Sequence, residues 1–236
     1  MIALFADRCD AAERLANRLS WLKGAIYTQE DIDSGHNPLI VLAIPRRGVI
    51  IGEIIGTALG AKLDLVVSRK IRAPLNPELA IGAVMPDGTC FLDAGNVEAL
   101  QVSQEYIDAE VNRQTREIAR RLISYRGRMD YENDIEGKIV ILVDDGVATG
   151  STVMAAAQWI RAQACRQLII AVPVGPKDAI EMLQDIADVI LVLEVPGSFD
   201  AVGEYYQDFP QVTDWEVKAI MRKHGYAVGL GESAVE

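Results

Sequence analysis

The stretch ILVDDGVATGST, from Ile141 to Thr152, decides the fold of this 236-residue chain. Its apolar start continues a run that begins at Ile139, and such a run is typical of a strand buried on both faces of a parallel sheet. Two adjacent acids, Asp144 and Asp145, stand where this strand ends. Open α/β sheets bind their ligands at the carboxyl ends of the strands. The stretch therefore predicts a ligand site built around the two carboxylates.

Small residues follow the acids and lead into a helix. Backbone N–H groups at a helix start have no partner within the helix, and the helix dipole adds positive potential, so this junction suits a phosphate group. Carboxylates beside it would repel a bare anion, so the ligand should also present hydroxyl groups or a cation. Ribose 5-phosphate meets this condition. The expected binding residues are Asp144, Asp145, Gly146, Val147, Ala148, Thr149, Gly150, Ser151 and Thr152.

A plainer alternative is a structural turn in which Asp145 or Thr149 only caps the helix. That alternative explains one polar residue, but not two adjacent acids followed by two glycines. We therefore favour a binding site over a purely structural junction.

Strand and helix patterns alternate on both sides of this stretch. An α/β fold follows, with a central, mostly parallel sheet and helices on both faces. The length fits one domain, residues 1–236, with a core at about 37–195. Strands are expected at 39–44, 63–68, 139–143, 168–172 and 189–193, and helices at 49–59, 103–125, 152–164 and 178–186.

Three further segments surround this core. Residues 69–77 carry prolines and cations among few large apolar residues, which favours a mobile loop over a helix or a central strand. A hairpin is expected next, with strands at 79–84 and 89–92, so the loop and hairpin span about 69–92. Asp10 and Glu13 form the pattern of a capping box for an N-terminal helix within residues 8–22. The aromatic-rich tail, 196–236, ends in a helix that opens at Thr213 and Glu216.

Composition narrows the classes of partner. The net charge is −11 and the pI is about 4.7, which disfavours binding to nucleic acid or to an anionic membrane surface. No apolar run is long enough to span a bilayer and no signal peptide is apparent, so a cytoplasmic protein is expected. Three scattered cysteines and two histidines, His36 and His224, show no metal-ligand spacing and are expected to be packing thiols and surface imidazoles.

The acidic stretch resembles the signature of the type I phosphoribosyltransferases: an apolar run, two acids, a short variable segment, then Thr-Gly and a closing Thr. The match lies at Asp144, Asp145, Thr149, Gly150 and Thr152. The resemblance covers most of the chain and implies the type I phosphoribosyltransferase fold with a small hood. It also implies that 5-phosphoribosyl pyrophosphate (PRPP) binds with Mg2+, and that the phosphoribosyl group moves to a nucleobase or related nitrogen acceptor.

The resemblance assigns roles to two more loops. Pro45, Arg46, Arg47 and Gly48 stand where the family has its pyrophosphate loop, which often contains a non-proline cis peptide; Arg47 replaces a glycine that many relatives carry. The segment from Arg69 resembles the catalytic flexible loop, with Lys70 and Arg72 as catalytic cations and Arg69 at the pyrophosphate. A solvated basic loop is the alternative interpretation of this segment.

Closer resemblance links RKIRAPLNPELAIGAV and the tail FDAVGEYYQDFPQVTDWEV to a bacterial subgroup of uncharacterised phosphoribosyltransferase-like proteins. By the same resemblance, Asp144 and Asp145 would be catalytic: they would hold the ribose hydroxyls and stabilise the positive charge that develops on the ribose. Phe199 would stack on the acceptor base. No protein ligand to the metal is expected: Mg2+ would be held mainly by PRPP, with water bridging to the two acids. Relatives that act on 6-oxopurines carry an Asp before Thr-Gly, where this chain has Ala148, so those bases are disfavoured.

Two other functions stay open. One is a non-catalytic regulatory protein that senses PRPP with the same fold, although the chain lacks the basic stripe that nucleic acid would need. The other is a dinucleotide-binding oxidoreductase, but no GxGxxG motif follows a predicted strand. The sequence leaves the oligomeric state open, with a homodimer as one option.

Overall fold

The computed structural model of the chain describes residues 3–23, 37–131 and 135–229, so His36 lies outside the described residues. Its centre is a five-stranded sheet in the order β2-β1-β6-β7-β8. All four strand pairs are parallel. The strands are β1 (Leu39–Ala43), β2 (Lys62–Leu65), β6 (Ile139–Val143), β7 (Gln167–Val174) and β8 (Val189–Glu194). This confirms the predicted α/β fold class with its parallel sheet.

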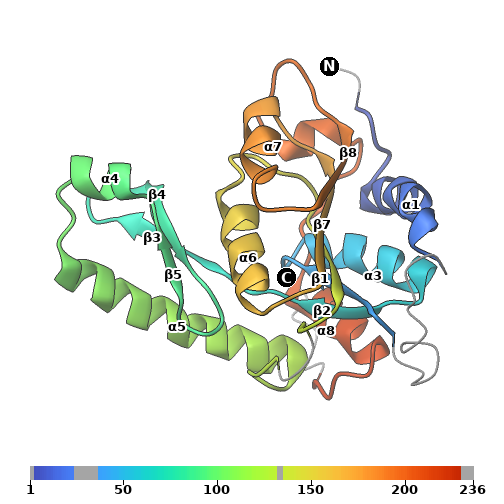
Figure 1. Cartoon of the computed structure of the whole chain (residues 1–236), viewed down its shortest axis with the longest axis horizontal. Coiled ribbons are helices and arrows are strands. Elements are labelled where there is room, and N and C mark those ends of the chain that lie inside the picture. Colours follow the sequence, from blue (N-terminus) through green and yellow to red (C-terminus); the bar gives the residue numbers. More distant parts are fainter. Residues whose placement is uncertain (1–2, 24–36, 132–134, 230–236) are drawn as a thin grey trace.

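Helices cover both faces of this sheet (Figure 1). Alternate residues of a strand point to opposite faces, so Val41 and Ile141 pack with one set of helices while Ile40 and Val140 pack with the other. The first set is α1 (Arg8–Arg18), α3 (Gly48–Leu59) and α8 (Asp214–Lys223); the second is α6 (Ser151–Ala162) and α7 (Lys177–Leu183). Burial on both faces explains why these strands are continuous apolar runs.

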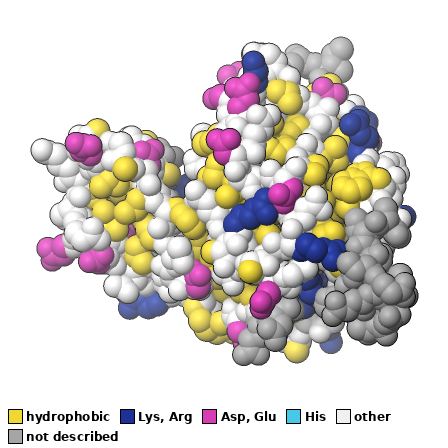
Figure 2. Space-filling model, viewed as in Figure 1, with side chains coloured by type: hydrophobic (Ala, Val, Ile, Leu, Met, Phe, Trp, Pro, Cys, Tyr) yellow, Lys and Arg dark blue, Asp and Glu magenta, His cyan; other side chains and the backbone are white. Residues whose placement is uncertain are grey.

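A second unit projects from the sheet, on the left of Figure 1. We call residues 69–126 the wing and the other described residues the body. The wing contains an antiparallel sheet in the order β3-β4-β5, namely β3 (Arg69–Ala73), β4 (Asn76–Val84) and β5 (Cys90–Leu92), with α4 (Ala94–Ala99) and α5 (Gln104–Arg126). Figure 2 shows a notch between the wing and the body.

The wing corrects one prediction. Residues 69–73 form a strand, where a mobile loop was expected. Burial alternates along β3, with Ile71 and Ala73 buried and Lys70 and Arg72 exposed, and the strand pairs with β4. Prolines are tolerated in turns, near strand ends and at bulges: Pro74 lies in the turn after β3, and Pro77 lies near the start of β4, where the register with β3 shifts. The predicted hairpin is confirmed as β4 and β5.

The N-terminal segment and the tail segment around Tyr206 meet beside the sheet. Phe5 forms a parallel bridge with Tyr206, and their rings lie 5.3 Å apart. The N-cap of α1 is Asp7, whose carboxylate accepts from Asp10 N at 2.9 Å, so the predicted cap at Asp10 was wrong by three residues. The predicted capping box of Thr213 and Glu216 is confirmed. Short 3-10 helices, η1 (Ser20–Leu22) and η2 (Val202–Tyr205), complete these segments.

None of the described helices is both long enough and apolar enough to cross a bilayer.

Candidate functional site

A cavity of about 470 Å³ opens at the carboxyl ends of β1 and β6. The chain leaves β1 towards β2 on one side and returns to β6 on the other side of β1. The loops after β1 and β6 therefore diverge and leave a crevice, which is where open α/β sheets bind ligands. The loops contribute, among others, Pro45, Arg46, Arg47, Asp144, Asp145, Gly146, Val147, Ala148, Thr149, Gly150 and Thr152 to its lining.

The loop after β6 ends in a helix start that faces this cavity. Gly150 adopts a left-handed conformation (φ 78°) at the N-cap of α6, which places Ser151 in the first turn. The N–H groups of that turn precede the bond from Met154 N to Gly150 O, so they have no acceptor within the helix. Val147 differs from the other predicted phosphate-binding residues, because its N–H donates to Val174 O at 2.8 Å. The available amides therefore lie at the helix start.

Asp144 lies half-buried in the lining of the cavity. One of its oxygens accepts from Asp145 N at 2.8 Å. Burial raises the pKa of Asp144 well above its ordinary value, and the negative charge of Asp145 raises it further. A ligand that brings hydroxyl donors or positive charge would favour the ionised form.

Asp145 is held differently, although its side chain also borders the cavity. Its Oδ2 accepts from Arg8 Nε at 3.0 Å, and both side chains are almost fully buried. Arg8 lies over the ring of Phe209, 3.8 Å from its centroid, and donates to Pro210 O at 2.8 Å. Tyr206 donates to the backbone carbonyl of Asp145 at 2.6 Å. Asp145 is therefore tied to the N-terminal helix and the tail, while its neighbour faces the cavity.

Burial and the neighbouring Arg8 shift the pKa of Asp145 in opposite directions. Burial raises its pKa above the ordinary value, and Arg8 counteracts part of that rise. Nη2 of Arg8 is buried with no hydrogen-bond partner among the described residues. The N-terminal helix thus contributes an arginine to the acidic pair.

The loop after β1 forms the opposite edge of the cavity. The peptide bond between Pro45 and Arg46 is cis. Arg46 bonds to Asp214 at 3.2 Å, and Arg47 lies 5.3 Å from the ring centroid of Phe209. A Cβ at Gly48 would lie 2.9 Å from Val143 O and 3.0 Å from Asp144 Cα. Glycine at this position therefore lets α3 begin directly against the end of β6.

The wing supplies two more cations to the lining, Lys70 from β3 and Arg121 from α5. Two other predicted cations do not line this cavity. Arg69 donates to Gln114 of α5 at 3.0 Å, and Arg72 is exposed, with its carbonyl accepting from Tyr106. Arg69 is on the other face of β3 from Lys70, because successive side chains of a strand point to opposite faces. Arg72 comes after a shift in the register between β3 and β4, so alternation alone does not place it.

The tail closes the remaining side with Val202, Gln211 and Val212. Phe199 lies instead in a neighbouring cavity of about 640 Å³, which also includes Ala148 and Thr149. Its ring stacks on Tyr205, with centroids 5.3 Å apart. The predicted base-stacking residue is therefore adjacent to the main cavity but outside its lining.

Sequence reasoning missed Arg8 and Arg121. Arg8 lies 137 positions from Asp145, and no local pattern connects them. Arg121 belongs to a helix whose many charged residues resemble an ordinary solvated face. Only the folded chain brings these arginines to the acids and to the cavity.

The parallel sheet, its helices and the crevice at its carboxyl edge are those of the type I phosphoribosyltransferase fold. Residues 15–207 match the family described as the phosphoribosyl transferase domain. Since the match covers more than half of the chain, this chain belongs to that family.

Individual relatives support the same family assignment. Two Mycobacterium tuberculosis proteins, named "Putative phosphoribosyl transferase Rv0571c" (strain H37Rv) and "Putative phosphoribosyl transferase MT0597" (strain CDC 1551), are each 37% identical over 218 residues. Those residues make up 92% of this chain and 46% of each relative, so the chain spans about half the length of the curated relatives it matches. The crystal structure of TT1426 from Thermus thermophilus is 36% identical, with a TM-score of 0.73, and the match covers 95% of this chain and 99% of that one.

Proposed function

We propose that this protein binds PRPP and transfers its 5-phosphoribosyl group to a nucleobase or related nitrogen acceptor. The observation that carries the proposal is the cavity between the loops after β1 and β6. It combines the start of α6, the inward-facing Asp144 and four cations, Arg46, Arg47, Lys70 and Arg121. PRPP offers one partner for each of these three features: its 5-phosphate suits the start of α6, its ribose diol suits Asp144, and its pyrophosphate suits the four cations.

Each wall of the cavity has one task in the proposed reaction. The N–H groups and hydroxyls at the start of α6 bind the 5-phosphate. Asp144 accepts hydrogen bonds from the ribose hydroxyls, and its negative charge stabilises positive charge that develops at C1 as pyrophosphate departs. The arginines and Lys70 bind the leaving pyrophosphate. The residues contribute position and charge more than proton transfer.

Asp145 supports this arrangement indirectly in the proposal. Its carboxylate is held by Arg8 and its backbone carbonyl by Tyr206. These bonds fix the backbone that carries Asp144, so that the acid facing the cavity is already oriented before the ligand arrives.

The residues present fit a magnesium ion that arrives with the donor. Mg2+ prefers oxygen ligands and is commonly held by one or two carboxylates together with substrate phosphates, and Asp144 offers a carboxylate in the cavity. Among the described residues, no three His, Cys, Asp or Glu side chains cluster as a ligand set. PRPP would hold most of the ion's coordination, and Asp144 and Asp145 would contact it through water. When bound, it would neutralise charge on the leaving pyrophosphate.

The acceptor would enter from the side of Ala148 and Thr149, which both cavities share. Ala148 carries no carboxylate to bond a purine N7, so a 6-oxopurine acceptor is not proposed. Phe199 borders the second cavity and is the candidate for contact with the acceptor base.

The direct test is turnover of radiolabelled PRPP with millimolar Mg2+ and a panel of nucleobases and other nitrogen acceptors. We expect release of pyrophosphate with at least one acceptor, and loss of that release in Asp144→Asn. Tight PRPP binding without turnover of any acceptor would favour the PRPP-sensing regulatory protein. Absence of PRPP binding would contradict both functions.

A further inference from the structure

Charge around the cavity is opposite in sign to that of the whole chain. The protein carries a net charge of −11, yet Arg46, Arg47, Lys70 and Arg121 line the same crevice. Four acids oppose these cations, namely Asp144 and Asp145 in the lining, Asp214 beside Arg46 and Glu117 beside Arg121, but Asp145 also pairs with Arg8 and Glu117 with Arg120. Local positive charge therefore remains for an anionic ligand. The body supplies half of these cations and the wing supplies the others.

Arg121 is the cation whose position no binding motif explains. It lies near the end of α5, the long helix of the wing whose C-terminal end lies beside the body (Figure 1). Tyr125 follows it by four residues and so lies on the same face of the helix. Tyr125 donates to Asp214 of α8 at 2.6 Å, which identifies this face as the one directed towards the body. Arg121 is therefore presented to the crevice by helix geometry.

Two buried contacts fix the end of α5. Arg126 forms a two-armed ion pair with Asp64 of β2, with both N–O distances at 2.6 Å and both side chains fully buried. The Tyr125 ring is also buried. The ion pair to β2 and the hydrogen bond to α8 therefore anchor the end of α5, which carries Arg121, against the body.

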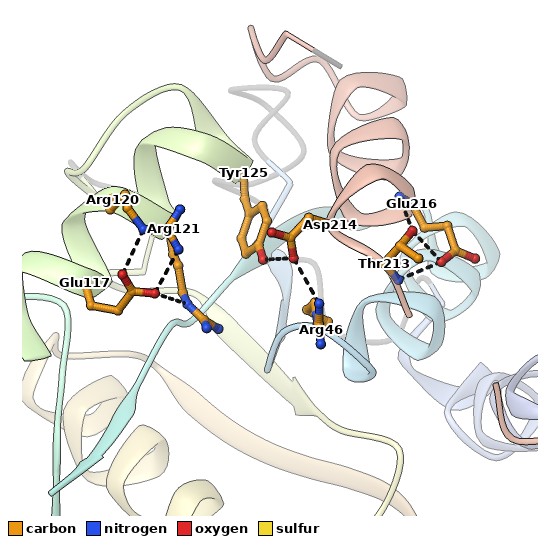
Figure 3. Close-up of polar contacts among 8 residues, drawn as sticks. All are labelled: Arg46, Glu117, Arg120, Arg121, Tyr125, Thr213, Asp214 and Glu216. Carbon is orange, nitrogen blue, oxygen red and sulfur yellow. Dashed lines mark hydrogen bonds and ion pairs between the residues drawn. The ribbon is translucent and has the colours of Figure 1, made fainter. Parts of the chain in front are cut away.

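Glu117 orients the Arg121 guanidinium. Its Oε1 accepts from Arg121 Nε at 2.9 Å, while Arg120 bonds to the same carboxylate (Figure 3). These hydrogen bonds to the two arginines lower the pKa of Glu117 to about 2, so the carboxylate stays charged at neutral pH. Only Arg121 of this pair lines the crevice.

Arg121 and Arg46 lie on either side of the same contact between α5 and α8. Asp214 bonds both Tyr125 and Arg46, as Figure 3 shows. A pyrophosphate group has more anionic oxygens than one arginine can bond, and planar guanidinium groups suit them. An anion held from both sides would connect the wing to the pyrophosphate loop.

We propose that Arg121 is a pyrophosphate-binding residue, which acts with Lys70 from the wing against Arg46 and Arg47 from the body. This inference rests on the proposed function and names a residue outside both loops that the family resemblance assigns to phosphate binding. The 5-phosphate occupies the start of α6 and does not contact Arg121. Loss of this side chain therefore weakens binding of pyrophosphate and spares ribose 5-phosphate.

Titration calorimetry with inorganic pyrophosphate and ribose 5-phosphate, each with Mg2+, tests this directly. Arg121→Met removes the charge and keeps a good helix former. We expect its pyrophosphate affinity to fall about tenfold or more, as expected for loss of a charge-assisted contact. Affinity for ribose 5-phosphate should stay within about twofold, and Arg121→Lys should recover part of the loss.

Arg120→Met is the matched control. It removes the adjacent arginine, which shares Glu117 but does not line the crevice, and it should leave pyrophosphate affinity within about twofold. Equal pyrophosphate affinity in Arg121→Met and wild type would overturn the inference and leave the proposed function intact, as would an equal loss in Arg120→Met. A parallel loss of ribose 5-phosphate affinity would also overturn it. A wild-type protein that binds neither ligand would contradict the proposed function itself.

Discussion

The two sides of the crevice are built by different means. On the body side, the site follows directly from two strand ends and two helix starts, with Gly48 in close contact with the Asp144 backbone. On the wing side, Lys70 and Arg121 reach the crevice from an edge strand and from a long helix. The body side therefore places backbone amides and acids as well as two arginines, while the wing side places only the ends of long charged side chains. This difference predicts that changes at closely packed body-side residues such as Arg8 and Gly48 lower stability, and that wing-side changes affect anion binding alone.

The largest effect is expected from Arg8→Met, which removes the partner of a buried carboxylate. An unpaired buried charge typically costs about 3–5 kcal/mol of unfolding free energy. Arg14→Met is the control, because Arg14 lies on the same helix and pairs with Asp10 at the surface; a change below about 1 kcal/mol is expected there. Chemical denaturation of both variants makes the measurement. Equal small effects would show that Asp145 does not depend on Arg8.

The same variant has a predicted pH dependence. Burial already raises the folded-state pKa of Asp145 above 3.8, so its ionisation costs stability as pH rises through the interval between the unfolded and folded pKa values. Without Arg8 the folded pKa rises further and this cost grows. The stability difference between Arg8→Met and wild type should therefore be largest near neutral pH and shrink as the pH falls towards 3.8. A difference that grows on acidification would contradict this sign.

Asp144→Asn should give the next largest effect, a loss of PRPP affinity. The substitution removes the carboxylate that faces the ribose in the proposed complex, and hydrogen bonds to charged groups contribute about 1.5–3 kcal/mol. PRPP affinity should fall by roughly 10- to 150-fold in calorimetry. The folded state should not lose stability, because burial and Asp145 both oppose ionisation of Asp144. Asp208→Asn, at an exposed carboxylate, is the control.

Gly48→Ala tests the close packing of the body side. The added Cβ would lie 2.9 Å from Val143 O and 3.0 Å from Asp144 Cα, so the start of α3 must shift. Overpacking of this kind costs about 1–3 kcal/mol. Thermal unfolding of Gly48→Ala should show this loss, whereas Gly197→Ala should not, since nothing lies within 4 Å of a Cβ there. A stable Gly48→Ala with unchanged PRPP affinity would show that this contact does not shape the site.

The smallest effect is expected at the contact between wing and body. Asp214→Asn removes a negative charge beside Arg46, so pyrophosphate affinity should rise about two- to fivefold at low salt and less at high salt. The capping box of Thr213 and Glu216 remains, which keeps α8 intact. Calorimetry at two ionic strengths makes the comparison. A lower affinity would mean that Asp214 orients Arg46 for the ligand instead of competing with it.

The body side could be predicted from the sequence because its signals are local. Buried runs mark the parallel strands, and paired acids followed by Thr-Gly mark the junction with α6. The same logic placed Arg46 and Arg47 at the end of β1, where they line the crevice.

The rest depends on distant contacts. The partner of Asp145 lies 137 positions away, and only the tertiary fold shows that one acid is tied while its neighbour faces the crevice. The β3 strand was missed because its cations and the two prolines that follow it, Pro74 and Pro77, outweighed the alternation of Ile71 and Ala73. Arg69 and Arg72 could not be separated from Lys70 without knowing which face of β3 borders the crevice and where the register of β3 with β4 shifts.

A crystal structure of the protein with PRPP and Mg2+ is the decisive experiment for the proposed binding mode. We expect the 5-phosphate on the backbone N–H groups at the start of α6, the ribose diol on Asp144 and the pyrophosphate between Arg46 and Arg121. A donor that occupies the crevice with its 5-phosphate away from the start of α6, or with its diol away from Asp144, would show that this binding mode is wrong.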